Sequence, residues 1–211
     1  MHLLTAQPGA VQDGETAVDL DQSPADLVVL SAAATDLAVL VAAKARLGGD
    51  APSLRLANVM QLGHNLSVDL YVEKTIAQAK LVVIRLLGGL GYWRYGVEQV
   101  SAVCRKRGIL LAVVPGDDAP DSELAAQSTI GAEAQHRLWQ YCDQAGPDNA
   151  DNFLRYAAAL LGAPAEWREP VPLLKAGLYA PGRHVPAIED VSRDWRDSAP
   201  IMPIVFYRAL V

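Results

Sequence analysis

The sequence predicts an α/β fold: a parallel-sheet sandwich of the Rossmann-like or flavodoxin-like kind, with helices on both faces. Apolar, β-prone runs begin at Leu27, Leu54, Leu81 and Ile109, so they recur every 27 or 28 residues. Segments with helical periodicity separate them, as in successive βα units. The runs at Leu27, Leu81 and Ile109 are continuously apolar rather than alternating, which is typical of strands covered on both faces.

Each segment between two runs has the signals of a helix. The three apolar stripes at helical spacing are Leu37, Leu40 and Val41; Val72, Ile76 and Ala79; and Trp93, Val97, Val100 and Cys104. Gly48-Gly49 and Gly108 are expected to end the first and third helices. Ser67 or Asp69 is expected to cap the second.

Two more helices are expected after the last run. Their stripes are Ala134, Leu138, Tyr141 and Ala145, followed by Phe153, Tyr156, Ala157 and Leu160. Asp148 can cap the second of these helices, and Gly162 with Pro164 ends it. We expect the two helices to pack as a hairpin on the sheet.

The prolines divide the chain into two parts. Seven of the 13 prolines lie between positions 164 and 203. We therefore predict an α/β head domain over residues 1–163, with a further strand at 2–6, and a proline-rich linker plus the start of a second α/β domain over 164–211. Apolar runs at 173–179 and 201–207 resemble strands. The last run either begins the second domain or returns to an edge of the first sheet.

Composition excludes several classes of protein. The net charge is −6 and no basic stripe is present, which argues against partners such as nucleic acid or an anionic membrane surface. No apolar run approaches the ~20 residues of a membrane helix, and the first residues lack the pattern of a secretory signal. These features predict a cytoplasmic protein. Cys104 and Cys142 have no Cys or His at metal-ligand spacing, so we expect core residues and no metal site.

Loops that follow parallel strands meet at one edge of a sheet, where ligands bind. Four loops qualify: 31–36, 58–67, 88–95 and 115–121. Asp117-Asp118 in the last of them could hold a divalent cation, although a solvated acidic turn explains it as well. His136, off its helix's apolar stripe, is expected to be solvated.

The glycine-rich loop carries the most information. Gly88-Gly89-Leu90-Gly91 follows a strand and opens a helix, as phosphate-binding turns do. Arg94 replaces the third glycine of the dinucleotide fingerprint, so nucleotide binding is a weak alternative, and a plain turn explains the glycines equally well. The aromatic residues Tyr92, Trp93 and Tyr95 could stack on a flat conjugated ligand. Trp93 also belongs to the apolar stripe, which favours a core role for it.

Two polar residues complete the candidate site. Arg85 interrupts an apolar strand, where it either anchors a ligand carboxylate or forms an internal salt bridge, for example with Asp69 or Asp117. His64 could serve as a metal ligand or proton carrier, or simply as a hydrogen-bonded loop histidine. The predicted substrate-binding residues are His64, Arg85, Gly88, Gly89, Tyr92, Trp93 and Tyr95.

The sequence resembles the amino-terminal portion of the large subunit of cobaltochelatases (CobN type). The segments that carry the resemblance include MHLLTAQPGAVQDG, PSLRLANVMQLGHNLSVDLYVEKT, AKLVVIRLLGGLGYWRYGVEQV and HRLWQYCDQAGPDNADNFLRYAAALLG. The match runs in register from Met1 to about Gly182 and is densest from Leu54 to Asp118. The family is related to the large subunit of magnesium chelatase, which acts on protoporphyrin.

The resemblance implies a function. Members insert cobalt(II), as a substrate, into hydrogenobyrinic acid a,c-diamide on the aerobic route to cobalamin. The large subunit binds the corrinoid, and two smaller subunits, one an AAA+ ATPase, drive the reaction with ATP. Family large subunits are far longer than this chain, so we expect a fragment that is inactive alone and assign it no catalytic residue. The alternative is a docking module for the ATPase subunits or for the remaining domains of the large subunit.

Overall fold

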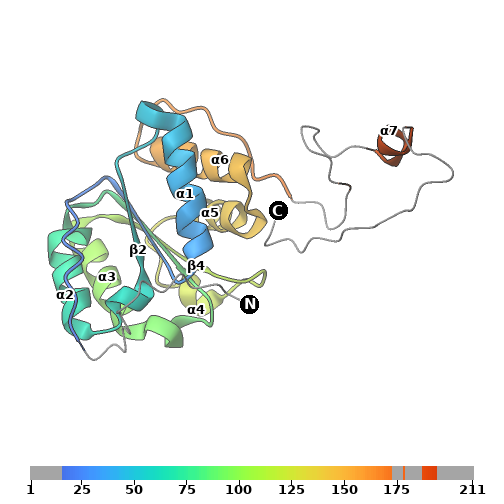
Figure 1. Ribbon diagram of the computed structural model, residues 1–211. Helices are drawn as coiled ribbons and strands as arrows, with labels where there is room; N and C mark the ends of the chain where they lie inside the picture. The colour runs from blue at the N-terminus through green and yellow to red at the C-terminus, as the bar shows by residue number, and fades with distance from the viewer. Residues whose placement is uncertain (1–15, 173–177, 179–186, 194–211) are drawn as a thin grey trace. The chain divides into compact units, whose positions relative to one another are not determined.

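The computed structural model describes residues 16–172, 178 and 187–193 (Figure 1). Internal contacts divide the chain into two units, residues 1–173 and 174–211. The first unit contains the sheet. In the second, the described residues form one short helix, α7 (Ile188–Ser192). The predicted strands at 2–6, 173–179 and 201–207 lie outside the described residues, apart from Leu178. The predicted domain boundary after residue 163 stays a prediction.

A four-stranded parallel sheet organises the first unit. The strands are β1 (Leu27–Ser31), β2 (Leu54–Asn58), β3 (Leu81–Leu86) and β4 (Leu110–Pro115). Their order is β2-β1-β3-β4, and all three neighbouring pairs are parallel. The predicted α/β class is therefore confirmed, and each of the four apolar runs forms a strand of this sheet.

Helices cover both faces of the sheet. The α-helices of this unit are α1 (Ala34–Leu47), α2 (Asn65–Lys74), α3 (Arg94–Arg107), α4 (Ser122–Ala125), α5 (Ala132–Gln144) and α6 (Pro147–Leu160). The 3-10 turns are η1 (Gly48–Asp50), η2 (Val59–Leu62), η3 (Ile76–Gln78) and η4 (Leu90–Trp93). Helices α1, α5 and α6 gather on one face, and α2 and α3 on the other (Figure 1).

Alternate residues of the central strands supply two apolar cores. Val82 and Ile84 of β3 face α2 and α3, whereas Leu81 and Val83 face α1, α5 and α6. All four side chains are fully buried. Burying apolar side chains on both faces of one strand requires the continuous apolar sequence that the prediction used. The helical hairpin of α5 and α6 completes the second core, as expected.

Helix ends follow the predicted signals only in part. Gly48 and Gly108 end α1 and α3, and Gly108 adopts the left-handed conformation. The expected caps Ser67 and Asp69 are wrong, because α2 begins at Asn65 and His64 caps it. Asp148 is also not a cap; it lies in the first turn of α6. The predicted second helix ends earlier, at Lys74, and Ile76 belongs to η3.

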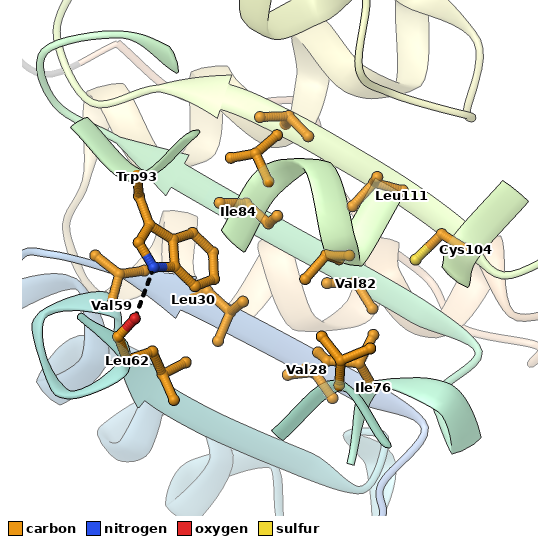
Figure 2. Packing of buried hydrophobic residues seen from close by; sticks show 14 of the residues in the cluster. Val28, Leu30, Val59, Leu62, Ile76, Val82, Ile84, Trp93, Cys104 and Leu111 are labelled. Carbon is orange, nitrogen blue, oxygen red and sulfur yellow. Dashed lines mark hydrogen bonds between the residues drawn. The ribbon is translucent and has the colours of Figure 1, made fainter. Parts of the chain in front are cut away.

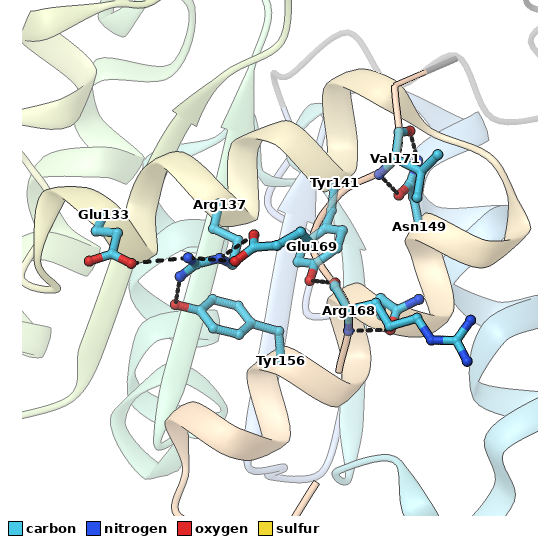
Figure 3. Close-up of polar contacts among 9 residues, drawn as sticks. Glu133, Arg137, Tyr141, Asn149, Tyr156, Arg168, Glu169 and Val171 are labelled. Carbon is cyan, nitrogen blue, oxygen red and sulfur yellow. Dashed lines mark hydrogen bonds and ion pairs between the residues drawn. The ribbon is translucent and has the colours of Figure 1, made fainter. Parts of the chain in front are cut away.

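The segment that follows α6 is held firmly against the helical hairpin. We call residues 163–172 the strap. The buried side chain of Asn149 accepts a hydrogen bond from the amide of Val171 and donates one to its carbonyl, both at 2.9 Å (Figure 3). The Tyr141 hydroxyl donates to the carbonyl of Arg168, and Asn152 accepts from the Arg168 amide at 2.9 Å. These side chains satisfy backbone groups that otherwise need a strand partner.

Arg137 of α5 also contacts the strap, through Glu169 and Trp167. Its guanidinium donates to both carboxylate oxygens of Glu169, at 2.8 and 3.0 Å (Figure 3). It also lies over the rings of Tyr156 and Trp167, with 5.1 and 4.8 Å to the ring centres. The first part of the predicted linker is therefore packed on the head unit as far as Val171.

Candidate functional site at the carboxyl edge of the sheet

The loops after the four strands lie along one edge, because all strands run in the same direction. The chain connects β1 to β2 on one side and returns to β3 on the other side of β1. This arrangement places the ends of β1 and β3 side by side at the point where the strand order reverses. Ser31 and Arg85 are paired in register at that point.

Arg85 is held by its own chain. One guanidinium nitrogen donates to Asp36 at 2.6 Å and another to the carbonyl of Gly116 at 2.9 Å, while Nε is buried without a partner. Ser31 donates to the other oxygen of Asp36 at 2.6 Å. The expected partners Asp69 and Asp117 are therefore wrong, although the internal salt bridge itself is present. Burial opposes the charge, but nearby Cys142 and Asp36 raise the pKa of Arg85 on balance.

Trp93 belongs to the core. Its side chain is 8% exposed, and its indole N–H donates to the carbonyl of Leu62 at 3.0 Å (Figure 2). A Cβ added at Gly96 would lie 2.0 Å from the Trp93 ring, so only glycine allows this packing. The bond between η4 and η2 ties the loop after β3 to the loop after β2. The core alternative for Trp93 is the one that the structure shows.

His64 and Tyr95 also have structural partners. The Nδ1 atom of His64 accepts a hydrogen bond from the amide of Leu66 at 3.1 Å, which caps α2. The Tyr95 hydroxyl donates to Asp69 at 2.8 Å, which links α3 to α2. His64 is therefore hydrogen-bonded within its loop, as one of the two alternatives expected, and its role as a metal ligand or proton carrier stays a prediction. Both side chains stabilise the loops of the edge.

The remaining predicted residues are presented to solvent. Gly88 and Gly89 have positive φ angles of 91° and 74°, which other residues rarely adopt. Tyr92 is 48% exposed. Three other apolar side chains after β2 and β3 are also exposed: Met60 in η2, Leu66 in the first turn of α2, and Leu87 directly after β3. We call these three residues and Tyr92 the apolar rim; the sequence did not predict it, because periodicity does not show which apolar residues are exposed.

A small open pocket lies at the β4 end of the same edge, between the loop after β4, α4 and α5. Its volume is about 280 Å³, and it is lined by Pro115, Pro120, Asp121, Ser122, Ala125, Gln135, His136 and Trp139. The rings of His136 and Trp139 are 5.2 Å apart. Trp139 donates its indole N–H to the carbonyl of Asp117 at 3.1 Å. A Cβ on Gly89 would lie 3.4 Å from Asp121, so the pocket adjoins the glycine turn.

Sequence reasoning missed this pocket. His136 is exposed, as expected, but it lines the pocket beside Trp139. Trp139 does not belong to the apolar stripe of Leu138 and Tyr141. An aromatic residue outside its helix's buried stripe is the feature of the sequence that could have predicted the pocket. A second hollow of about 330 Å³ lies at the opposite edge, before β4, and is lined by Cys104, Arg105, Gly108, Ile109, Leu110 and Thr129.

The two cysteines of this unit have thiols with a raised pKa. Burial raises the pKa of both Cys104 and Cys142 to about 12, although Arg105 and Arg85 respectively oppose the shift. Cys104 is buried and Cys142 partly so. Within the described residues, no group of three or more His, Cys, Asp or Glu side chains could hold a metal ion. None of the helices in this part of the chain is long and apolar enough to cross a membrane.

The chain resembles named cobaltochelatase subunits. It is 45% identical over 209 residues to the aerobic cobaltochelatase subunit CobN of Pseudomonas aeruginosa, and 45% identical over 220 residues to that of Sinorhizobium sp. These alignments cover 99% and 100% of this chain, and the chain spans only 17% of either relative. No family model matches the sequence.

A solved structure agrees with these relatives. The catalytic subunit of cobaltochelatase from Mycobacterium tuberculosis superposes with a TM-score of 0.58 and 28% identity, over 76% of this chain and 12% of that one. The α/β architecture is therefore shared with a part of that catalytic subunit. The chain is related over nearly its whole length to part of the cobaltochelatase subunit CobN, and the predicted resemblance to the large subunit of cobaltochelatases is confirmed.

Proposed function

We propose that this chain forms part of the large, corrinoid-binding subunit of an ATP-dependent cobaltochelatase of the cytoplasm. That enzyme would insert cobalt(II), its metal substrate, into hydrogenobyrinic acid a,c-diamide on the aerobic route to cobalamin. ATP would be hydrolysed by an AAA+ partner subunit. The observation that carries the proposal is the 45% identity to cobaltochelatase subunits over nearly the whole chain.

The geometry favours a contribution to one wall of a binding site. Within the described residues, the pockets at the two edges are small and open, near or below the lower end of the usual range of ~300–1,000 Å³ for small-molecule sites. A corrinoid is a large, flat macrocycle with acidic side arms. Tyr92 offers an exposed ring, and the Gly88-Gly89 turn lets the macrocycle approach the backbone closely. The other candidates, His64, Arg85, Trp93 and Tyr95, hold these loops in place.

Corrinoid titration of the large subunit that carries this sequence tests the proposal. Replacing Tyr92 with Ala removes one stacking surface, so we expect the Kd for hydrogenobyrinic acid a,c-diamide to rise about threefold to tenfold. Val41→Ala, at an exposed apolar residue on α1, is the matched control and should leave the Kd unchanged. Failure of the unmodified subunit to bind the corrinoid or to support cobalt insertion would contradict the function.

Docking is the second candidate function, and the apolar rim favours it. Met60, Leu66, Leu87 and Tyr92 are each about half exposed, and they come from the segments that follow β2 and β3, which the Trp93–Leu62 hydrogen bond connects. A contiguous exposed apolar patch is typical of an interaction surface, and these four side chains come from neighbouring segments at the carboxyl edge of the sheet. The expected occupant is another domain of the large subunit, since this chain spans 17% of its relatives.

The two functions predict different outcomes. Under docking, Met60→Ser with Leu87→Ser leaves the corrinoid Kd unchanged, but it loosens the subunit so that limited proteolysis releases this unit. Under direct contact, the same double variant weakens corrinoid binding and the protease pattern stays the same.

A further inference from the structure

The pocket at the β4 end has a chemistry that the cobaltochelatase proposal does not use. Its lining combines two aromatic rings, those of His136 and Trp139, with the carboxylate of Asp121. Indole rings bind cations over their faces, and carboxylates bind them by charge and hydrogen bonds. The combination is suited to an organic cation.

Uncompensated negative charge surrounds the pocket. Positions 117–123 contain Asp117, Asp118, Asp121 and Glu123, without a basic residue. Glu123 contacts Arg94 at 3.9 Å, whereas within residues 16–172 no Lys or Arg forms an ion pair with any of the three aspartates. A cationic partner would supply the missing countercharge.

A metal ion does not fit this site. Asp117 accepts from the amide of Ala119, and Asp121 accepts from the amide of Leu124. These carboxylates do not converge with His136 into a cluster that could hold a metal, within the part of the chain described. The volume of about 280 Å³ instead suits a single long side chain with a flat head. Guanidinium is planar, stacks on aromatic rings and pairs with carboxylates, so arginine matches better than lysine.

We propose that this pocket binds an arginine side chain from a basic segment of a partner protein, stacked against Trp139 and paired with Asp121. Asp117 and Asp118, both exposed, extend the negative surface beyond the pocket and would attract flanking basic residues. The net charge of −6 is consistent with a basic partner. The inference is independent of corrinoid binding and of cobalt insertion.

A short blocked peptide, acetyl-Gly-Arg-Gly-amide, is the probe, added to the chain of residues 1–211. The indole N–H resonances of the tryptophans report on the site. We expect the Trp139 resonance to shift saturably, while that of the buried Trp93 stays fixed. The matched peptide with citrulline, which keeps the shape and loses the charge, should bind at least tenfold more weakly. The lysine peptide should fall between them.

Asp121→Asn separates charge from structure. The Asn oxygen can still accept from the amide of Leu124 and cap α4, so the fold is retained. We expect this variant to bind the arginine peptide about fivefold more weakly, and 0.5 M salt to weaken binding to the unmodified chain. Equal binding of the citrulline peptide, an unmoved Trp139 resonance, or full affinity in Asp121→Asn would each overturn the proposal.

Discussion

The two ends of the carboxyl edge use their polar and aromatic side chains in different ways. The loops after β1, β2 and β3 form what we call the β1–β3 end, where Arg85, Trp93 and His64 all bond to their own chain. At the β4 end, His136 and Trp139 border an open pocket, with Asp121 beside them. The β1–β3 end contains most of the residue types that the sequence analysis selected, but most of these side chains form hydrogen bonds within the fold. At the β4 end Trp139 and Asp121 also bond to their own chain, but their side chains still line an open pocket.

The largest expected effect tests whether Arg85 is structural. Arg85→Ala would leave the largely buried Asp36 carboxylate without its cation, so we expect a loss of about 3 kcal/mol in the free energy of unfolding. Urea denaturation followed by circular dichroism measures it.

Arg46→Ala is the matched control for that variant. Arg46 also contacts an aspartate, Asp151, at 2.6 Å, but its side chain is 41% exposed compared with 12% for Arg85. Exposed pairs contribute little, so the control should lose no more than about 1 kcal/mol. Equal losses in the two variants would contradict the view that the buried Arg85–Asp36 pair contributes more to stability than an exposed pair does.

The next effect concerns the packing of Trp93. In Gly96→Ala, the new methyl group would overlap the indole ring, and overpacking of this kind typically costs about 1–3 kcal/mol. We expect a loss of about 2 kcal/mol in thermal or urea unfolding.

Gly91→Ala tests the same kind of change nearby. Nothing lies within 4 Å of a Cβ at Gly91, so stability should change by less than about 0.5 kcal/mol. If Gly96→Ala changes the free energy of unfolding as little as Gly91→Ala does, the Trp93 ring can move aside. Trp93 would then again be a candidate for ligand contact.

A smaller effect is expected at the cap of α2. His64→Ala removes the acceptor for the amide of Leu66, and losses of this kind cost about 1 kcal/mol. His64→Asn keeps an acceptor at a favourable capping residue and should restore the stability. A loss of corrinoid binding in His64→Asn, with full stability, would contradict the purely structural role.

Local sequence patterns predicted the architecture well, but they could not identify the partners of individual side chains. The continuous apolar runs predicted β1, β3 and β4, because burial on two faces requires them. Arg85 and Asp36 are 49 positions apart, and Trp93 and Leu62 are 31 apart, so these pairs depend on which strands are neighbours. The cap at His64 was missed because histidine is not among the preferred capping residues, whereas Ser67 and Asp69 are.

The candidate site was harder to predict for the same reason. The pocket combines the loop after β4, α4 and one side of α5, and no single segment shows it. The seven substrate-binding residues were predicted from their residue types. Four of them form hydrogen bonds to their own chain: His64, Arg85, Trp93 and Tyr95. Exposure, which separates Tyr92 from Trp93 one residue later, depends on the irregular geometry of η4 and follows no simple periodicity.

Tyr92→Ser has the smallest expected effect on stability and tests the comparison most directly. The Tyr92 side chain is 48% exposed, so the free energy of unfolding should change by no more than about 0.5 kcal/mol in urea denaturation. Its ring lies beside the glycine turn, since a Cβ added at Gly88 would be in ordinary van der Waals contact with it, at 3.8 Å. A loss of 2 kcal/mol or more would show that Tyr92, like Trp93, is needed for folding. The β1–β3 end would then retain no aromatic side chain for a ligand among the predicted residues, and a partner would have to be sought at the β4 end, where Trp139 and Asp121 lie.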